Sequence, residues 1–199
     1  MKSAVQRLAL LAAGLLASLA AHANPAPYPH PGHEAPANTF VAAASGELLA
    51  YYTGLAGGNT NLVGASINGF DGPTGLTDKG SAYGQTFVLG QVTAGDSVAF
   101  FIDTTDSNGN TLRFYSDKAR NSDGVNHAWT TPYAGDADVP AGLHIAFEDL
   151  EHGGDFNYAD HGIVVTLVTA TPVPEPASWA LMLGGAAGLA VLRRRHIGR

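Results

Sequence analysis

Between residues 40 and 172, hydrophobic side chains fall in short runs or alternate with polar ones, and turns rich in Gly, Asn and Asp separate these runs. This pattern is typical of β-strands about 4 to 8 residues long. Strands are expected at residues 47–53, 62–67, 83–89, 97–102, 111–115, 143–147 and 162–169. Residues 98–102, Val-Ala-Phe-Phe-Ile, are apolar on both faces of a strand, which indicates a central position in a sheet.

Many short strands without helical periodicity favour an all-β domain, and we predict an antiparallel β-sandwich, jelly-roll-like, over residues 39–171. The pair Asn108-Gly109 predicts a type I′ hairpin turn before the strand at 111–115. The segment 117–138 is long and rich in polar and aromatic residues. A loop of this length is typically functional or held in place by other contacts.

The N-terminal end has the pattern of an export signal. Residues 1–23 carry two early basic residues, an apolar stretch at 8–20 and the cleavage pattern Ala21-His22-Ala23, in which Ala21 and Ala23 are the small residues. We therefore expect a secretory signal helix that is removed from the mature protein. The proline-rich residues 24–38 that follow predict an extended, solvated linker.

The C-terminal end predicts a transmembrane helix. Residues 177–192 carry no charge and would form a helix about 24 Å long, slightly short for a hydrocarbon core of about 30 Å. Pro174 and Pro176 prevent the helix from starting earlier. Arg193, Arg194 and Arg195 follow, and the positive-inside rule leaves them in the cytoplasm while the domain lies on the other side of the inner membrane.

Charge and motifs exclude several functions. Residues 24–172 hold 16 acidic and 4 basic residues, a net charge of −12, which argues against nucleic acid as a partner. The chain has no cysteine, and it lacks a P-loop, a dinucleotide fingerprint, a G-x-S-x-G elbow and an HExxH motif. We therefore predict that the protein is not an enzyme. A polysaccharide hydrolase, which would need two carboxylates across a cleft, is the less favoured alternative.

The candidate chemistry lies in residues 148–160, between two predicted strands. Carboxylates this close together repel each other unless a cation lies among them or some are protonated. Oxygen ligands at this density suit Ca²⁺. The predicted ligands are Glu148, Asp149, Asp155, Asn157 and Asp160. The spacing does not match an EF-hand, and the alternative is a solvated turn in which Asp and Asn side chains bond to their own backbone.

Two parts of the chain resemble known families. Val173-Pro174-Glu175-Pro176, the apolar segment and the basic tail resemble the PEP-CTERM sorting signal, which assigns residues 172–199 to sorting. The resemblance implies recognition by an exosortase, removal of the helix and transfer to the cell surface or the exopolysaccharide matrix. A plain C-terminal membrane anchor is the alternative.

The second resemblance is to a domain of unknown function found on bacterial surface proteins. Phe147-Glu148-Asp149 followed by Gly154-Asp155-Phe156-Asn157-Tyr158-Ala159-Asp160 is similar to its F-E-D and G-D-x-D-Y-N-D pattern. Asn157 and Ala159 replace the usual Asp and Asn, which puts one ligand or loop-fixing bond in doubt. The family implies a β-sandwich with a proposed Ca²⁺ role, and it does not imply an enzyme.

Together these features predict an exported surface or matrix protein with a non-catalytic, calcium-stabilised module. The alternative is a calcium-dependent carbohydrate-binding module, with exopolysaccharide as its partner. In that case Tyr115, Trp129 and Tyr133 would offer faces on which sugars stack.

Overall fold

A computed structural model describes residues 25–55 and 57–174 of this protein. The predicted signal peptide, transmembrane helix, Glu175, Pro176 and the three arginines lie outside the described residues. Over the ranges that are described, no helix has the length and apolar character needed to cross a membrane.

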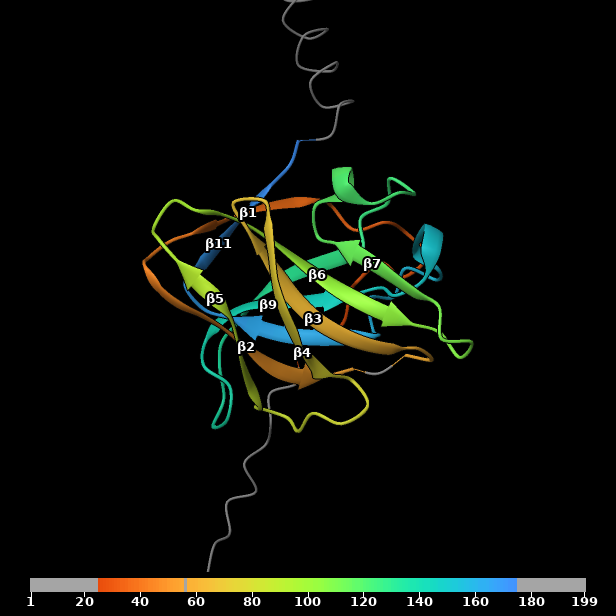
Figure 1. The fold of residues 1–199 in the computed structure, drawn as a ribbon, viewed down its shortest axis with the longest axis horizontal. Coiled ribbons are helices and arrows are strands. Elements are labelled where there is room, and N and C mark those ends of the chain that lie inside the picture. The colour runs from red at the N-terminus through yellow and green to blue at the C-terminus, as the bar shows by residue number, and fades with distance from the viewer. Residues whose placement is uncertain (1–24, 56, 175–199) are drawn as a thin grey trace, which may run out of the picture.

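The described chain forms two antiparallel sheets packed face to face (Figure 1). Sheet A has the order β11 (Val168–Pro172), β1 (Asn38–Ala42), β6 (Ser97–Thr105), β3 (Thr60–Ile67) and β4 (Phe70–Thr77), with β7 (Thr111–Tyr115) also paired to β6. Sheet B has the order β5 (Thr86–Val92), β2 (Gly46–Gly54), β10 (His161–Val165), β9 (Gly142–Phe147) and β8 (Ala128–Tyr133). Two short 3-10 helices, η1 (Lys118–Arg120) and η2 (Glu151–Gly153), lie in loops.

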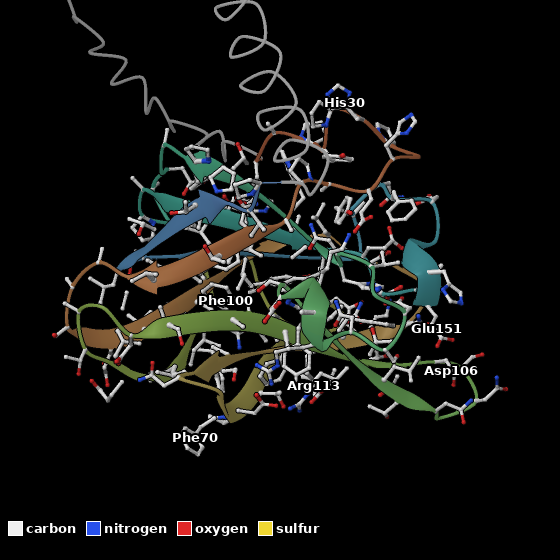
Figure 2. The ribbon with its side chains drawn as sticks, turned by 90° about the horizontal axis from the view of Figure 1, so that it is seen from above. His30, Phe70, Phe100, Asp106, Arg113 and Glu151 are labelled. Carbon is white, nitrogen blue, oxygen red and sulfur yellow. The ribbon has the colours of Figure 1, made fainter. Side chains whose placement is uncertain are left out.

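The core lies between the two sheets and follows the alternation of the strands. Leu48 of β2, Phe100 of β6 and Ile163 of β10 are fully buried there. Figure 2 shows Phe100 inside the sandwich, whereas Phe70 and Asp106 lie at its periphery. The predicted all-β antiparallel fold is confirmed.

The prediction that residues 98–102 form a central strand is also confirmed. Strand β6 pairs with β1, β3 and β7. Phe100 and Ile102 face the core, and Phe101 turns to the outer face of sheet A. There its ring lies over Gly64 of β3, where an added Cβ would come within 2.4 Å of a ring atom.

The segment predicted as one strand at 162–169 is two strands in different sheets. The chain turns at Thr166-Leu167, with Leu167 at a φ of 62°, and passes from β10 in sheet B to β11 in sheet A. The sequence hides this turn because β-branched residues stand on both sides of Leu167. The prediction of a long loop at 117–138 is wrong for a related reason, because η1 and the edge strand β8 lie within it.

Besides β8, two further strands were not expected from the sequence, β1 and β4. Strand β4 contains Gly72, Pro73 and Gly75, and its position at the edge of sheet A tolerates a proline that a central strand would not. The hairpin between β6 and β7 is confirmed, but its turn is not type I′. Asn108 does not have a positive φ, and Asp106 accepts backbone hydrogen bonds from Asn108 and Asn110.

Residues 25–37, predicted as a solvated linker, instead pack on the domain. Tyr28 and Ala35 are only 7% and 4% exposed. The Ala35 backbone N–H donates to the Tyr158 hydroxyl at 2.8 Å, and Asn126 Nδ2 donates to the Ala35 carbonyl at 2.9 Å. Proline composition predicted the extended backbone but not this docking, which buries apolar surface against the outer face of sheet B.

Candidate metal centre

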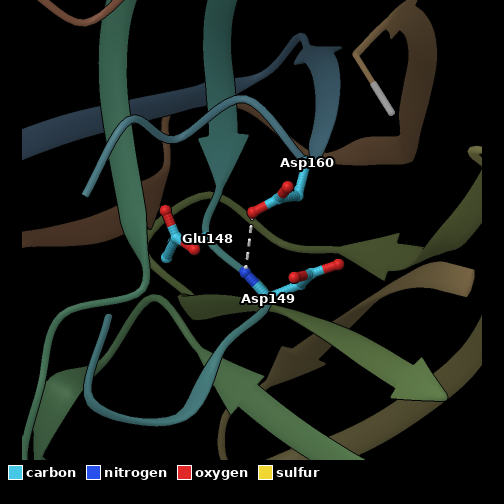
Figure 3. A group of neighbouring side chains, drawn as sticks. All are labelled: Glu148, Asp149 and Asp160. Atoms are coloured by element: carbon cyan, nitrogen blue, oxygen red, sulfur yellow. Dashed lines mark hydrogen bonds between the residues drawn. The ribbon is translucent and has the colours of Figure 1, made fainter. Parts of the chain in front are cut away.

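Three carboxylates meet where two neighbouring strands of sheet B end. Glu148 and Asp149 follow β9 directly, and Asp160 directly precedes β10. These strands pair with Phe147 opposite His161, so the connection between them starts and finishes at one place. Figure 3 shows the resulting group of Glu148, Asp149 and Asp160, which we call the acidic centre.

The acidic centre is compact and largely buried. One carboxylate oxygen from each of the three residues lies within 4.8 Å of the others. Glu148 and Asp149 are 1% and 3% exposed. The backbone N–H of Asp149 donates to Asp160 Oδ2 at 3.1 Å, the contact drawn in Figure 3.

Two glycines give the acidic centre its room. A Cβ at Gly57 would lie 2.1 Å from Asp160 Oδ1, and a Cβ at Gly154 would lie 2.7 Å from Glu148 Oε1. Any other residue at these positions would therefore push a carboxylate out of place.

Burial raises the pKa of each of the three carboxyl groups. For Glu148 burial is the largest cause and the charge of Asp160 adds to it. For Asp160 burial again comes first, followed by the charge of Asp149. Burial also raises the pKa of Asp149, although hydrogen bonds from Asn61 and Asn59 oppose the shift. The centre therefore resists carrying three negative charges unless a cation shares it.

Within the described part of the chain, no lysine or arginine forms an ion pair with these three carboxylates. In addition, the buried Glu148 Oε2 has no hydrogen-bond partner there. A buried, unpartnered carboxylate oxygen is costly, and a bound cation would satisfy it. The donor set fits Ca²⁺, which takes hard oxygen ligands in flexible geometry.

Sheet A and the loop before β8 hold the acidic centre from two sides. Asn61 of β3 donates from Nδ2 to Asp149 Oδ2 at 2.8 Å, while its own Oδ1 accepts from the Thr104 hydroxyl of β6. On the other side, the buried ring of His127 contacts the Glu148 carbonyl through Nδ1 at 3.0 Å and Asp123 Oδ2 through Nε2 at 3.0 Å. Because both partners are acceptors, both contacts are hydrogen bonds only if each ring nitrogen carries a hydrogen.

The loop between Asp149 and Asp160 has several residues in the left-handed backbone conformation, and the Tyr158 side chain anchors it. His152, Phe156 and Tyr158 all have positive φ, between 50° and 62°. The Tyr158 hydroxyl is buried and donates to the Asn126 carbonyl at 2.9 Å. This bond ties the loop to Asn126, and the Ala35 N–H, which donates to the same hydroxyl at 2.8 Å, ties it to the N-terminal segment.

The structure places the other two predicted ligands apart from the acidic centre. Asp155 accepts hydrogen bonds from the Asn157 backbone N–H at 3.1 Å and from Asn157 Nδ2 at 2.8 Å. Asn157 Oδ1 accepts from the Ala159 N–H at 2.7 Å. Both residues thus form the turn bonds of the alternative interpretation, while Glu148, Asp149 and Asp160 form the group expected of a metal site. A role for Asp155 and Asn157 as ligands stays a prediction.

The three aromatic residues considered for sugar stacking have different surroundings. Tyr133 is 7% exposed and packs with Val139 and Val164. The Tyr115 ring is covered by the Arg120 guanidinium at 3.6 Å. Trp129 lines a cavity on the outer face of sheet B.

The fold and this centre define an acidic, all-β surface-type module with a carboxylate cluster at one end. Comparison with known families agrees: residues 92–168 match a domain of unknown function (DUF4114), and residues 172–195 match the PEP-CTERM protein-sorting motif. The protein therefore carries a PEP-CTERM sorting motif behind this domain, as the sequence resemblance predicted. No curated protein and no solved structure matches the chain significantly.

The structural domain begins well before the matched residues. Strands β1 to β4 and nearly all of β5 precede residue 92. They supply β1, β3 and β4 to sheet A and β2 and β5 to sheet B. Asn61 and Gly57, which shape the acidic centre, come from this upstream part. Neither residue could be predicted from the sequence, because no local signal relates it to a loop about ninety residues away. Strand pairing places Asn61 beside Thr104, and from there it reaches Asp149.

Proposed function

We propose that this protein is an exported, non-catalytic surface or matrix module whose β-sandwich is stabilised by Ca²⁺ at the acidic centre. The PEP-CTERM motif implies an exported protein that is anchored in the membrane before an exosortase processes it. Its final place on the surface or in an exopolysaccharide matrix is part of the proposal.

The unpartnered Oε2 atom of Glu148 carries the calcium proposal. Glu148 is 1% exposed, lies beside Asp149 and Asp160, and has an oxygen without a partner among the described residues. Calcium bound by Glu148, Asp149 and Asp160 would neutralise the group and tie the β9–β10 connection together. Backbone carbonyls or water would complete its shell of six to eight oxygens.

Burial of the carboxylates favours this role over catalysis. A glycosidase needs its two carboxyl groups on either side of a bound sugar bond. Glu148 and Asp149 are nearly inaccessible, which suits the ligation of an ion better than contact with a polymer.

Thermal unfolding of the full chain in mild detergent tests the calcium proposal, with EDTA in one sample and millimolar Ca²⁺ in the other. A ligand that binds only the folded state at 100 times its Kd adds about 2.7 kcal/mol, so we expect the midpoint to rise by several degrees. Magnesium at the same concentration should give a smaller rise, because it demands a stricter octahedral site. An unchanged midpoint in Ca²⁺ would refute the proposal.

Glu148→Gln is the matched variant, since it keeps the shape and removes one charge. It should fold in EDTA and lose the response to Ca²⁺, because a negative charge on Glu148 is unfavourable without the ion and is needed only to bind it. If Glu148→Gln responds to Ca²⁺ as the wild type does, the ion binds elsewhere.

The sorting part of the proposal has its own test. The mass of the C-terminal peptide is measured on the surface protein from cells with and without the exosortase. Loss of the residues after the motif, dependent on the exosortase, is expected. A surface protein that still ends in Arg199 would show a plain membrane anchor instead.

A further inference from the structure

A second feature lies on the outer face of sheet B. A cavity of about 490 Å³ is enclosed there by strands β2, β8 and β9, by the docked N-terminal segment and by the end of the loop before β10. This volume lies within the range of about 300 to 1,000 Å³ typical of small-molecule sites. Its lining includes the side chains of Tyr28, Thr53, Trp129, His144 and Tyr158.

Two buried polar side chains of the cavity have no partner among the described residues. Both ring nitrogens of His144 and the Thr53 hydroxyl make no hydrogen bond there. His144 is 1% exposed and Thr53 is 6% exposed. Buried polar groups are nearly always hydrogen-bonded, so a cluster of unpartnered groups on one cavity wall points to a missing ligand.

The two groups face one space, over the backbone of Gly162. A Cβ added to Gly162 of β10 would lie 2.8 Å from Thr53 Oγ1 and 3.1 Å from His144 Nε2. The missing side chain at this position therefore leaves the two buried polar atoms close to one point beside Gly162.

The cavity is uncharged, although the domain around it is strongly acidic. None of its lining residues is Asp, Glu, Lys or Arg. Burial lowers the pKa of His144 to about 4, so its ring is neutral at pH 7 and offers one donor and one acceptor. A charged ligand would find no counter-charge here, whereas a hydroxyl can both donate and accept.

The remaining wall is aromatic. The Tyr28 ring packs edge-on against Trp129 at 5.6 Å and against Tyr158 at 4.9 Å, measured between ring centroids. Aromatic side chains offer apolar faces with a polar tip. A ligand that combines hydroxyl groups with a flat C–H face matches both walls, and this combination is the chemistry of a sugar ring.

We propose that this cavity binds a neutral saccharide unit, with Thr53 and His144 hydrogen-bonded to its hydroxyl groups and Trp129 packed against its C–H face. Binding goes beyond the calcium role, and its test is separate. The thermal shift in Ca²⁺ reports on the acidic centre, whereas a saccharide titration reports on this cavity.

Trp129 provides the readout. The chain has only two tryptophans, and a full chain carrying Trp179→Phe keeps Trp129 as the single fluorophore. This protein, in mild detergent, is titrated with neutral oligosaccharides of glucose, galactose and mannose and with the neutral exopolysaccharide of the producing cells. A saturable change in fluorescence with at least one of them is expected. The absence of any change, or a change only with an apolar probe such as octanol, would overturn the proposal.

Thr53→Val tests the site itself, because it removes the hydroxyl and keeps the shape. We expect the Kd to rise about tenfold while the unfolding midpoint stays level or rises, since an unpartnered buried hydroxyl has been removed. A merely structural Thr53 would give the opposite result for stability.

Gly162→Ala is the second variant, and it should weaken binding by placing a methyl group between the two polar atoms. Thr131→Val is the matched control, since Thr131 lies in β8 opposite His144 but outside the cavity lining, and its Kd should stay within twofold. Equal affinities for wild type, Thr53→Val and Gly162→Ala would place the sugar elsewhere.

Discussion

The protein holds two groups of clustered carboxylates, and the two groups have different surroundings. On the outer face of sheet A, Asp71 and Asp103 contact Arg113, and Asp71 also contacts Arg120; we call these four residues the arginine network. Arg113 donates hydrogen bonds to Asp103 from Nε at 2.6 Å and from Nη2 at 2.7 Å. Its Nη1 lies 2.7 Å from Asp71 Oδ2. Arg120 Nη2 lies 2.8 Å from Asp71 Oδ1.

The pKa values separate the two groups. Burial alone would raise the pKa of Asp71, but hydrogen bonds from Tyr115, Arg120 and Arg113 hold it well below its usual range. In the acidic centre, burial and mutual repulsion raise the pKa values of Glu148 and Asp160. The arginine network uses two of the four basic residues between 24 and 172. Among the described residues, no lysine or arginine forms an ion pair with the acidic centre, so the proposed cation would come from solution.

The largest effect is expected from a variant that distorts the acidic centre and keeps its three carboxylates. Gly57→Ala places a methyl group 2.1 Å from Asp160 Oδ1, whereas the neighbouring Gly58→Ala meets no atom within 4 Å. Gly57→Ala should therefore lose most of the Ca²⁺ stabilisation, up to about 2.7 kcal/mol at 100 times the Kd. Calorimetric unfolding with EDTA and with Ca²⁺ measures it. Gly58→Ala should respond like the wild type, and equal responses in the two variants would contradict the assignment of the site.

The next effect breaks the arginine network instead. Arg113→Ala removes two ion pairs and the contact of the guanidinium with the Phe101 ring at 3.9 Å. Because Arg113 is about one third exposed, we expect a loss of about 2 kcal/mol in the free energy of unfolding. Urea unfolding measures the loss, and the gain on adding Ca²⁺ should remain. A variant that also lost the Ca²⁺ response would show that the two groups are coupled across the sandwich.

The pH dependence sharpens the comparison. In EDTA the folded protein retains protons on Glu148 and Asp160 that the unfolded chain, with pKa values near 4, has already released. The free energy of unfolding should therefore fall as the pH rises from about 4 to the folded pKa of Glu148, about 8, by at most about 1.4 kcal/mol per pH unit for each proton.

Saturating Ca²⁺ should flatten or reverse this slope, because the ion binds the deprotonated carboxylates. Asp71, whose pKa is lowered, contributes stability above the unfolded pKa that is lost at lower pH, so its window lies below that of the acidic centre. Stability curves measured at several pH values with and without Ca²⁺ provide the check. Parallel curves would mean that no carboxylate in this range binds the ion.

The smallest effect concerns Asp155. Its carboxylate holds the turn through Asn157, so Asp155→Ala should cost about 1 kcal/mol and leave most of the Ca²⁺ response in place. The check is the rise of the thermal unfolding midpoint in Ca²⁺, compared between Asp155→Ala and Glu148→Gln, of which Glu148→Gln should lose the rise. If Asp155→Ala loses it as well, Asp155 is a ligand and the set of five predicted from the sequence is the right one.

Local pattern was enough for much of the fold. The alternation in 47–53 and 143–147 predicted strands whose ends lie within one residue of those of β2 and β9. It failed at 162–169, because β-branched residues continue through the turn at Leu167, and at 70–77, where Gly72 and Pro73 conceal an edge strand. Edge strands have weaker requirements for composition than central ones, so their signal in the sequence is weaker.

Sequence by itself determined the class of fold, the sorting motif at the C-terminal end and the position of the acidic loop. These depend on neighbours along the chain: alternation, motif order and the density of carboxylates within a dozen residues. Tertiary structure decided which carboxylates meet. Glu148, Asp149 and Asp160 come together because β9 and β10 are paired, while Asp155 and Asn157 are used in the turn between them. The cavity at Thr53 and His144 likewise exists only because β2, β10 and β9 lie side by side beneath a docked N-terminal segment. Contacts between distant segments depend on strand pairing and burial, and neither can be predicted from the residues of one segment alone.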